Sequence, residues 1–263
     1  METARAITAD IQPPTGCQMC MNGRKAQLHL TLECNIHCYF CPIKESEFGT
    51  DVMEVRGRKY DASTPMAVML DDIVNDPSVD GAAISGGEPL MHPERTYQAI
   101  EYLRLRRGPQ FHIHLYSNGI AIDAAVLRRL NALKINELRV NSLKPRIFSQ
   151  LAGAQFQVVC EIPCIPDPRY LERLCDLLPE LPRYGVHALN LNELEATEET
   201  RQIYLRKGFA IEGNRAVESA AYARQIRQFI AERDLDISVF FCNFEIAEKI
   251  RISRNRLENG TLS

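Results

Sequence analysis

Long apolar runs are missing from this sequence of 263 residues. No stretch reaches the roughly 18 apolar residues that a helix needs to cross a bilayer, so we expect no membrane partner. Residues 1–14 have no apolar segment typical of a secretory signal, and we therefore expect a cytoplasmic protein. An excess of basic residues is missing too, since 31 Lys and Arg face 34 Asp and Glu. The charge pattern thus gives no indication of nucleic-acid binding.

The sequence also has no internal repeat and no long linker, which favours one main domain. Short apolar runs alternate with longer amphipathic stretches, as is typical of βα units around a parallel sheet. We expect strands near residues 26–32, 81–84, 112–116, 137–140, 156–162, 186–191 and 237–241, and helices near 63–74, 92–106, 123–133, 167–181, 216–233 and 243–257. Polar or thiol side chains follow each expected strand, and such ends meet at one edge of a parallel sheet.

Cysteine is plentiful, with nine residues, and disulfides are rare in the compartment we expect. Cys34, Cys38 and Cys41 form a C-x3-C-x2-C pattern after the first expected strand. Thiolates suit iron–sulfur clusters and zinc, and a closed site of either kind normally takes four ligands. Three thiols in one loop therefore suggest a cluster with one iron open to an outside ligand. The alternatives are a zinc-stabilised binding module and an iron–sulfur protein for electron transfer or scaffolding, both without catalysis.

Two further motifs follow the triplet in order. Residues 85–89 read Ser-Gly-Gly-Glu-Pro after the second expected strand, and residues 117–119 read Ser-Asn-Gly after the third. With an aromatic residue, Phe40, before the last cysteine of the triplet, these motifs resemble the signature of the radical S-adenosylmethionine (SAM) superfamily. The layout is similar to that of pyruvate formate-lyase-activating-enzyme-like proteins.

The resemblance implies an α/β fold, a partial (β/α)6 TIM-like barrel of parallel strands over residues 25–200. Residues 1–24 would be an N-terminal extension that carries a Cys-x2-Cys pair. Residues 201–263 would be a C-terminal extension of helices and a strand, packed on the core. We expect this three-part organisation of the chain.

The resemblance also implies an activity. Cys34, Cys38 and Cys41 would bind three irons of a [4Fe-4S] cluster, and SAM would chelate the fourth. The reduced cluster would cleave SAM to a 5′-deoxyadenosyl radical that abstracts hydrogen from a substrate. The activating-enzyme-like layout favours a peptide or protein substrate, and the chemistry implies an electron donor such as flavodoxin or ferredoxin. The resemblance gives no catalytic residue beyond these ligands.

Eight residues are candidates for binding SAM: Phe40, Gly86, Gly87, Glu88, Ser117, Asn118, Asn141 and Ser142. Glycine allows close backbone approach, and the Glu88 carboxylate suits either an ammonium group or the fixing of its own loop. Ordinary turns and a helix cap explain the Ser and Asn residues equally well. Residues 190–195 form a polar rim that could face substrate, although solvated loop residues explain it as well.

The Cys17–Cys20 pair is a candidate for a second metal site, because C-x2-C on a turn is a common metal knuckle. Cys242 or Cys164 could complete it in space. The alternative is two thiols without a metal. Cys160 and Cys175 fit core positions of a strand and a helix.

Overall fold

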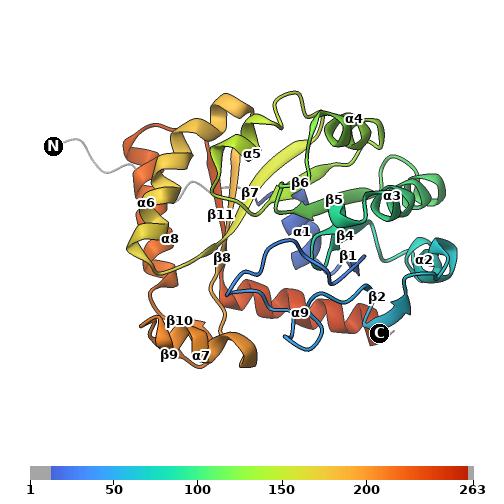
Figure 1. Cartoon of the computed structure of the whole chain (residues 1–263), viewed down its shortest axis with the longest axis horizontal. Coiled ribbons are helices and arrows are strands. Elements are labelled where there is room, and N and C mark those ends of the chain that lie inside the picture. The colour runs from blue at the N-terminus through green and yellow to red at the C-terminus, as the bar shows by residue number, and fades with distance from the viewer. Residues whose placement is uncertain (1–12, 260–263) are drawn as a thin grey trace.

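Seven parallel strands form most of one sheet in the computed structural model, which describes residues 13–259 without the side chains of residues 256–259. They are β1 (Lys25–His29), β4 (Gly81–Ser85), β5 (His112–Ser117), β6 (Glu137–Val140), β7 (Gln157–Cys164), β8 (Ala188–Glu193) and β11 (Ser238–Cys242). An antiparallel hairpin of β2 (Val52–Val55) and β3 (Arg58–Asp61) pairs with β1. The order is β11-β8-β7-β6-β5-β4-β1-β2-β3, so within residues 13–259 the sheet is an open, partial barrel (Figure 1). The predicted fold class is confirmed.

Helices lie on both faces of this sheet. Those along its outside in Figure 1 are α2 (Met66–Val74), α3 (Pro93–Arg107), α4 (Ala124–Ala132), α5 (Pro145–Ser149), α6 (Pro168–Leu177) and α8 (Ser219–Glu232). Two 3-10 turns, η1 (Pro89–Met91) and η2 (Leu178–Tyr184), precede α3 and follow α6. Helices α1 (Thr15–Met21) and α9 (Phe244–Asn259) pack against each other and against β1 on the concave face. Segments from both halves of the chain therefore cover the inside of the barrel.

A small unit after β8 carries its own apolar cluster. It consists of α7 (Glu198–Arg206) and the short hairpin of β9 (Ile211–Glu212) and β10 (Arg215–Ala216). Tyr204 and Phe209 are buried in this cluster, and Tyr39 and Phe40 of the cysteine loop pack against it. The unit therefore supports the loop that carries the cysteine triplet.

The two faces of the parallel strands differ in chemistry. The outer face is apolar, because side chains in matching register such as Leu28, Ile84, Leu115 and Leu138 are buried under the outer helices. The concave face carries buried polar side chains: Lys25, His112, His114, Glu137, Arg139 and Glu161. Successive side chains of a strand point to opposite faces, so this contrast follows from the alternation in runs such as residues 112–115.

The buried polar side chains contact one another, although His114 Nε2 has no hydrogen-bond partner in the described part of the chain. The Lys25 Nζ lies 2.8 Å from His112 Nδ1 and 2.9 Å from His114 Nδ1. The Arg139 guanidinium donates to Glu137 at 2.7 Å and to Glu161 at 2.5 Å. Buried charges need such partners, and the network fills the barrel where most proteins place apolar side chains.

Helix α1 is fastened to this network by its second residue. The Gly16 amide donates a 2.7 Å hydrogen bond to Glu137 Oε1. A Cβ on Gly16 would lie 2.4 Å from His114 Nδ1, closer than real Cβ contacts. Only glycine therefore lets the helix sit this close to the sheet.

Several local predictions were wrong. The Cys-x2-Cys pair lies on helix α1 and not on a turn, and α2 begins after Pro65, while Ser63 bonds Asp61 instead of capping the helix. Pro163 was expected to end its strand but lies inside β7. It is tolerated because β6 ends where Val140 pairs with Cys160, which leaves β7 a partner on one side only beyond that point.

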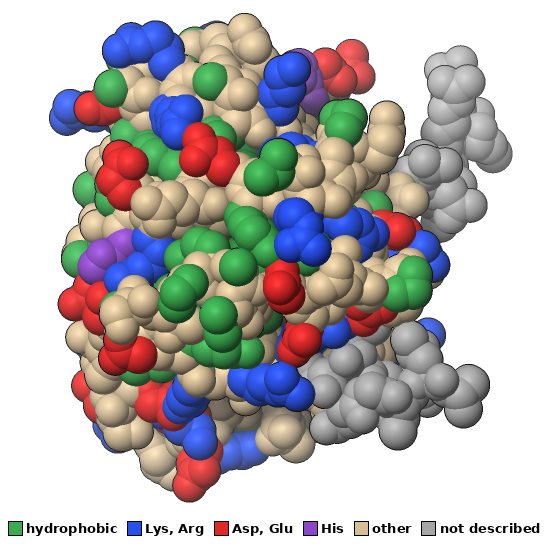
Figure 2. Space-filling model, turned by 90° about the vertical axis from the view of Figure 1, so that its right-hand side faces the viewer, with side chains coloured by type: hydrophobic (Ala, Val, Ile, Leu, Met, Phe, Trp, Pro, Cys, Tyr) green, Lys and Arg blue, Asp and Glu red, His purple; other side chains and the backbone are tan. Residues whose placement is uncertain are grey.

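Some elements had no counterpart in the prediction: the hairpin of β2 and β3, helix α5, and the unit of α7, β9 and β10. The expected division of the chain at residues 24/25 and 200/201 stays a prediction. On the face that Figure 2 shows, basic and acidic side chains are interspersed among apolar ones. Among residues 13–259, no helix is both long and apolar enough to span a bilayer.

Candidate functional site

The cysteine triplet lies in an irregular loop between β1 and β2. Backbone hydrogen bonds close the loop at its base, from Leu32 N to Thr50 O at 3.1 Å and from Gly49 N to Leu32 O at 3.0 Å. Cys34, Cys38 and Cys41 line a cavity of about 420 Å³ at the carboxyl ends of the strands. This is the edge of the sheet at which the sequence predicted function.

The loop with the two glycines is joined to the start of the cysteine loop. The amide of Gly87 donates to Thr31 O at 2.8 Å, and the amide of Glu88 donates to Glu33 O at 2.7 Å. A Cβ on Gly86 would lie 2.2 Å from Thr31 O, and one on Gly87 would lie 2.0 Å from Glu33 O. Gly86 also has φ of 119°, which side chains disfavour. Both glycines are required for the two loops to meet.

Glu88 is buried and uses both carboxylate oxygens inside the protein. Oε1 accepts from Leu90 N at 3.1 Å and from the Ser117 hydroxyl at 2.9 Å, and Oε2 accepts from Asn118 N at 2.6 Å. Burial raises the pKa of Glu88, and these hydrogen bonds oppose the shift. Of the two roles considered for this carboxylate, the geometry supports fixing the loops.

Asn118 connects the third motif to the cysteine loop. Its Nδ2 donates to Asn35 Oδ1 at 2.6 Å and lies 3.9 Å from Cys34 Sγ. Its Oδ1 accepts from Ile120 N at 3.0 Å, which forms the turn expected for Ser-Asn-Gly. The side chain therefore serves both the turn and the wall of the cavity.

The structure brings nearly all predicted SAM-site residues to this cavity: Phe40, Gly86, Gly87, Glu88, Ser117, Asn118 and Asn141 line it with the three cysteines. Ser142 is not among the lining residues, and its hydroxyl accepts from Lys144 N in a turn. Asn192, Glu193 and Glu195 of the polar rim do line the cavity. Sequence reasoning missed Tyr116, Thr197 and Tyr204, of which Tyr116 had a signal, its place at the end of an expected strand.

The three thiols are protonated in the absence of a metal. Burial raises the pKa of Cys38 to about 11, with the neighbouring thiols contributing, and burial also raises the pKa of Cys34 and Cys41. A metal must displace these protons to bind. Among the described residues, no three cysteine sulfurs lie within 4.8 Å of one another, as a single tetrahedral zinc would require.

The cavity fits an iron–sulfur cluster and SAM. It is lined by three spaced thiols and by the glycine loop that is joined to the start of the cysteine loop. Phe40 and Asn141 add an aromatic ring and an amide to its lining. This donor set suits a soft metal cluster with one open position beside an organic ligand.

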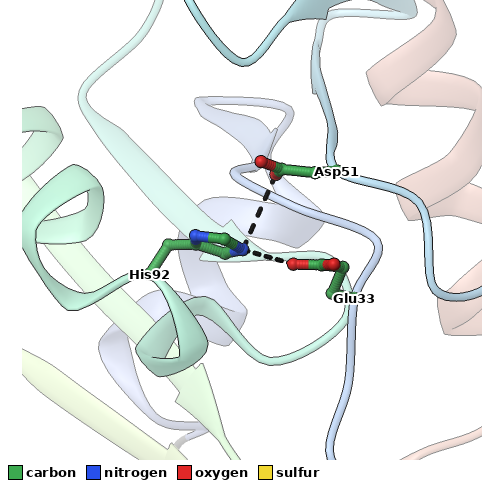
Figure 3. Close-up of side chains that lie close together, drawn as sticks. All are labelled: Glu33, Asp51 and His92. Atoms are coloured by element: carbon green, nitrogen blue, oxygen red, sulfur yellow. Dashed lines mark hydrogen bonds and ion pairs between the residues drawn. The ribbon is translucent and has the colours of Figure 1, made fainter.

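A second group of side chains that could bind a metal lies next to this site, but its members already pair with other side chains of the protein. Glu33, Asp51 and His92 offer atoms within 4.8 Å of one another, and His92 Nε2 lies 2.5 Å from Glu33 and 3.7 Å from Asp51 (Figure 3). The Arg95 guanidinium binds both oxygens of Asp51, at 2.5 Å and 2.9 Å. Arg95 thus supplies the positive charge that a metal ion would otherwise bring to these carboxylates. The group connects the cysteine loop, the residue before β2 and the start of α3.

The candidate second metal site is also assembled in part. Cys17, Cys20 and Cys242 line a cavity of about 250 Å³, which shares Tyr116 and Asn192 with the first cavity. Cys164 does not line it, because its thiol donates to Ser219 O at 3.1 Å on the outer face. Cys160 is fully buried, as expected, while Cys175 is half-buried on α6.

Comparison with known proteins agrees with the motifs. The family model described as Radical SAM superfamily matches residues 28–143, which include all three motifs. A protein of Methanocaldococcus jannaschii, named as a candidate glycyl-radical enzyme activating enzyme, is 25% identical over 94% of this chain and 67% of its own length. The resemblance stated from the motifs is confirmed, and the family match supports an iron–sulfur cluster and SAM as cofactors.

Two solved structures show a similar fold. SuiB of Streptococcus suis bound to SAM has a TM-score of 0.56 and 10% identity, over 83% of this chain and 50% of SuiB. SuiB bound to its precursor peptide SuiA has a TM-score of 0.57 and 11% identity, over 83% of this chain and 48% of SuiB. The chain thus spans about half the length of these solved proteins, and at this identity the likeness concerns the fold.

Proposed function

We propose that this chain, a radical SAM enzyme similar to activating enzymes, holds a [4Fe-4S] cluster on Cys34, Cys38 and Cys41 and cleaves SAM reductively. When bound, the cluster and SAM would supply a carbon radical that removes hydrogen from a substrate. One observation carries the proposal: the three thiols and the Gly86–Gly87 loop line the same cavity.

The residues of the chain divide into those that face the ligands and those that position them. The three thiols lose their protons when iron binds, and the backbone at Gly86 and Gly87 offers a close surface to SAM. Asn141 offers an amide group to the cavity, while the Asn118 amide also bonds Asn35 and Ile120. Glu88 is a positioning residue, because both of its oxygens are occupied by other groups of the protein.

The proposed substrate is a peptide or protein. The relative named for activation of glycyl-radical enzymes supports this class. A further cavity of about 560 Å³ shares Ser85, Gly86 and Tyr116 with the first and leaves room beside SAM for a substrate segment. Reductive cleavage takes one electron for each SAM, so we also propose a flavodoxin or ferredoxin as the donor.

A zinc-binding module is the less well supported interpretation of the cysteine triplet. In a tetrahedral site with Zn–S bonds of about 2.3 Å, the sulfurs lie about 4 Å apart. Among the described residues, the three sulfurs of the triplet do not all lie within even 4.8 Å of one another. A larger, cubane-type cluster accepts thiolates that stand further apart.

The test is production of 5′-deoxyadenosine. The protein would be purified and loaded with iron and sulfide without oxygen, and SAM and dithionite would then be added. Mass spectrometry should show 5′-deoxyadenosine above a sample without dithionite. Cys34→Ala, Cys38→Ala and Cys41→Ala should each lower the yield at least about 100-fold, whereas Cys175→Ala on α6 should not.

Full cleavage by a triplet variant would overturn the proposed ligands. If the loaded protein makes no product, the EPR signal of the reduced cluster with and without SAM decides the matter. A change on addition of SAM would mean that cleavage requires substrate, and an unchanged signal would contradict the proposal. Transfer of deuterium from a Cα-labelled peptide to 5′-deoxyadenosine would test the substrate class.

A further inference from the structure

A second set of three cysteines lies inside the barrel, away from the first cavity's thiols. Cys17 and Cys20 come from α1, and Cys242 comes from the end of β11, where it pairs in register with Asn192 of β8. All three line the cavity of about 250 Å³ described above. Segments about 220 residues apart thus place three thiols on one enclosed space.

The position of the Cys-x2-Cys pair is built by specific contacts. The hydrogen bond from Gly16 N to Glu137, and the close approach that only glycine permits, hold α1 against the sheet. Arg139 Nη1 then lies 3.2 Å from Cys17 Sγ. Cys20 and Cys242 are half-buried at the cavity, and Cys17 is buried. These thiols have fixed places in the interior, unlike a pair on a surface turn.

The surroundings favour a negatively charged occupant. Lys25, Arg139 and Arg254 lie near the thiols, and the carboxylates near these three cations are Glu54, Glu137 and Glu161. The nearby rings of His112 and His114 are uncharged, because burial lowers the pKa of both. Arg251 also lines the cavity but pairs with Glu195 at 2.8 Å. Besides Arg251, the charged side chains that line the cavity are Arg139, Arg254 and Glu161, so its wall carries more positive than negative groups.

This charge distinguishes between possible occupants. An oxidised cubane core of about +2 with three thiolates carries about −1, a sign that suits an arginine-rich wall. A single zinc would need the sulfurs to converge, and the three do not lie within 4.8 Å of one another. A guanidinium at hydrogen-bond distance from Cys17 is also a common device for stabilising a thiolate ligand.

We propose that Cys17, Cys20 and Cys242 hold a second [4Fe-4S] cluster, beside the first cavity. On assembly, three thiols release their protons to solvent and three iron–thiolate bonds form. Equal amounts of ferrous and ferric iron with sulfide supply the oxidised core, so no further oxidant is consumed. The fourth iron would keep a position for a non-cysteine ligand.

The test separates the two sets of cysteines. In the variant Cys34→Ser/Cys38→Ser/Cys41→Ser, only the second set remains for a cluster. After anaerobic loading with ferrous and ferric iron and sulfide, this variant should bind about four irons and four sulfides per chain, half of the wild-type content. Adding Cys20→Ser or Cys242→Ser should lower the iron at least about fourfold, and adding Cys175→Ser should not. Urea unfolding would check that each variant is folded.

Alkylation provides a readout that needs no further substitution. In the triple variant, loaded iron should protect Cys20 and Cys242, the two half-buried thiols, from iodoacetamide, and removal of iron by a chelator should make them reactive. Cys175 should react equally in both states. Mass spectrometry of the digested protein would quantify the labelling.

Three results would overturn the second cluster. They are no sulfide in the triple variant, zinc bound without sulfide when zinc is supplied together with iron and sulfide, and a Cys17–Cys20 disulfide with no iron. None of these depends on SAM cleavage, so failure here is distinguishable from failure of the proposed function. Conversely, a protein with two clusters and no 5′-deoxyadenosine would retain this site.

Discussion

The backbone amide of Asn118 donates a 2.6 Å hydrogen bond to Glu88 Oε2 inside the protein. The same carboxylate accepts from Ser117 and from Leu90, so it joins the ends of β4 and β5 to the start of η1. Glu88 N in turn donates to Glu33 O, next to Cys34. One buried side chain and its amide therefore set the relative positions of all three motifs.

Replacement of this carboxylate should be costly although it leaves the cavity walls in place. In Glu88→Gln, the amide NH2 must face either Asn118 N–H or Leu90 N–H, and both are donors. An opposed buried donor costs about 1–3 kcal/mol, so we expect a loss of that size in the free energy of unfolding by urea. Glu94→Gln, at an exposed position in the first turn of α3, should change it by less than about 0.5 kcal/mol. Equal stability of the two variants would contradict the positioning role.

Gly86 should tolerate no side chain. In Gly86→Ala the Cβ would clash with Thr31 O and the backbone would be strained, for a cost of about 2–4 kcal/mol. Gly153 is the matched control, since its φ of 97° is also positive but nothing lies within 4 Å of its Cβ position. Gly153→Ala should therefore cost only the backbone strain. SAM affinity, measured by calorimetry, should fall at least about tenfold in Gly86→Ala and not in Gly153→Ala.

Gly16→Ala should loosen α1 from the sheet. The new Cβ would overlap His114 Nδ1 and force the Gly16 amide away from Glu137. Cys17 and Cys20 should then react faster with a thiol reagent in the metal-free protein, by at least about tenfold. Thr15→Ala, at the exposed first residue of the same helix, should leave the rate unchanged. A rate in Gly16→Ala equal to that of wild type would show that the close approach is not what holds the helix.

The interior network should make the protein sensitive to acid. Burial raises the pKa of Glu137. The hydrogen bond from His112 and the charges of Arg139 and Lys25 lower the pKa by more than burial raises it, so its value is about 2. The folded state therefore binds this proton less readily than the unfolded chain, and stability is lost as pH falls from about 4.5 to about 2. The loss is on the order of 3 kcal/mol.

His114 extends the pH range in which stability is lost to higher pH values. Burial, with the charges of Lys25 and Arg139, lowers its pKa, so only the unfolded chain takes up the proton below about pH 6.5. Urea unfolding from pH 7 to pH 3 should show falling stability across the range. In Glu137→Gln the slope between pH 4.5 and 3 should flatten; an unchanged slope would assign the acid effect to other groups.

The parallel strands could be predicted because their apolar runs are short and are followed by polar or thiol side chains. The Cys-x2-Cys helix could not, because α1 has seven residues and gains its stability from Gly16 and Glu137, which lie 121 residues apart. Local propensity carries no information on such a contact. The missed β2–β3 hairpin had one signal in the sequence, Gly57, which lies at the turn where Arg56 and Gly57 both adopt positive φ.

The sequence predicted which residues at strand ends lie near the cavity. It did not predict which partner a side chain binds when two are possible. The sequence placed Glu88 beside the cavity, but only the fold shows that its oxygens face Leu90, Ser117 and Asn118. Tyr204 reaches the cavity from α7, through a unit whose position depends on packing against Tyr39 and Phe40. Ser142 adjoins a predicted strand end, yet its hydroxyl closes a local turn.

The pairing of α1 with α9 has a consequence for biosynthesis. Domains fold as the chain emerges from the ribosome, N-terminal part first. The strands from β1 to β8 can form their sheet while α9 is still unmade, and until then the concave face has only α1 upon it. By then every cysteine of the two sets except Cys242 has been made. Iron and sulfide can therefore reach the interior before the last helix covers it.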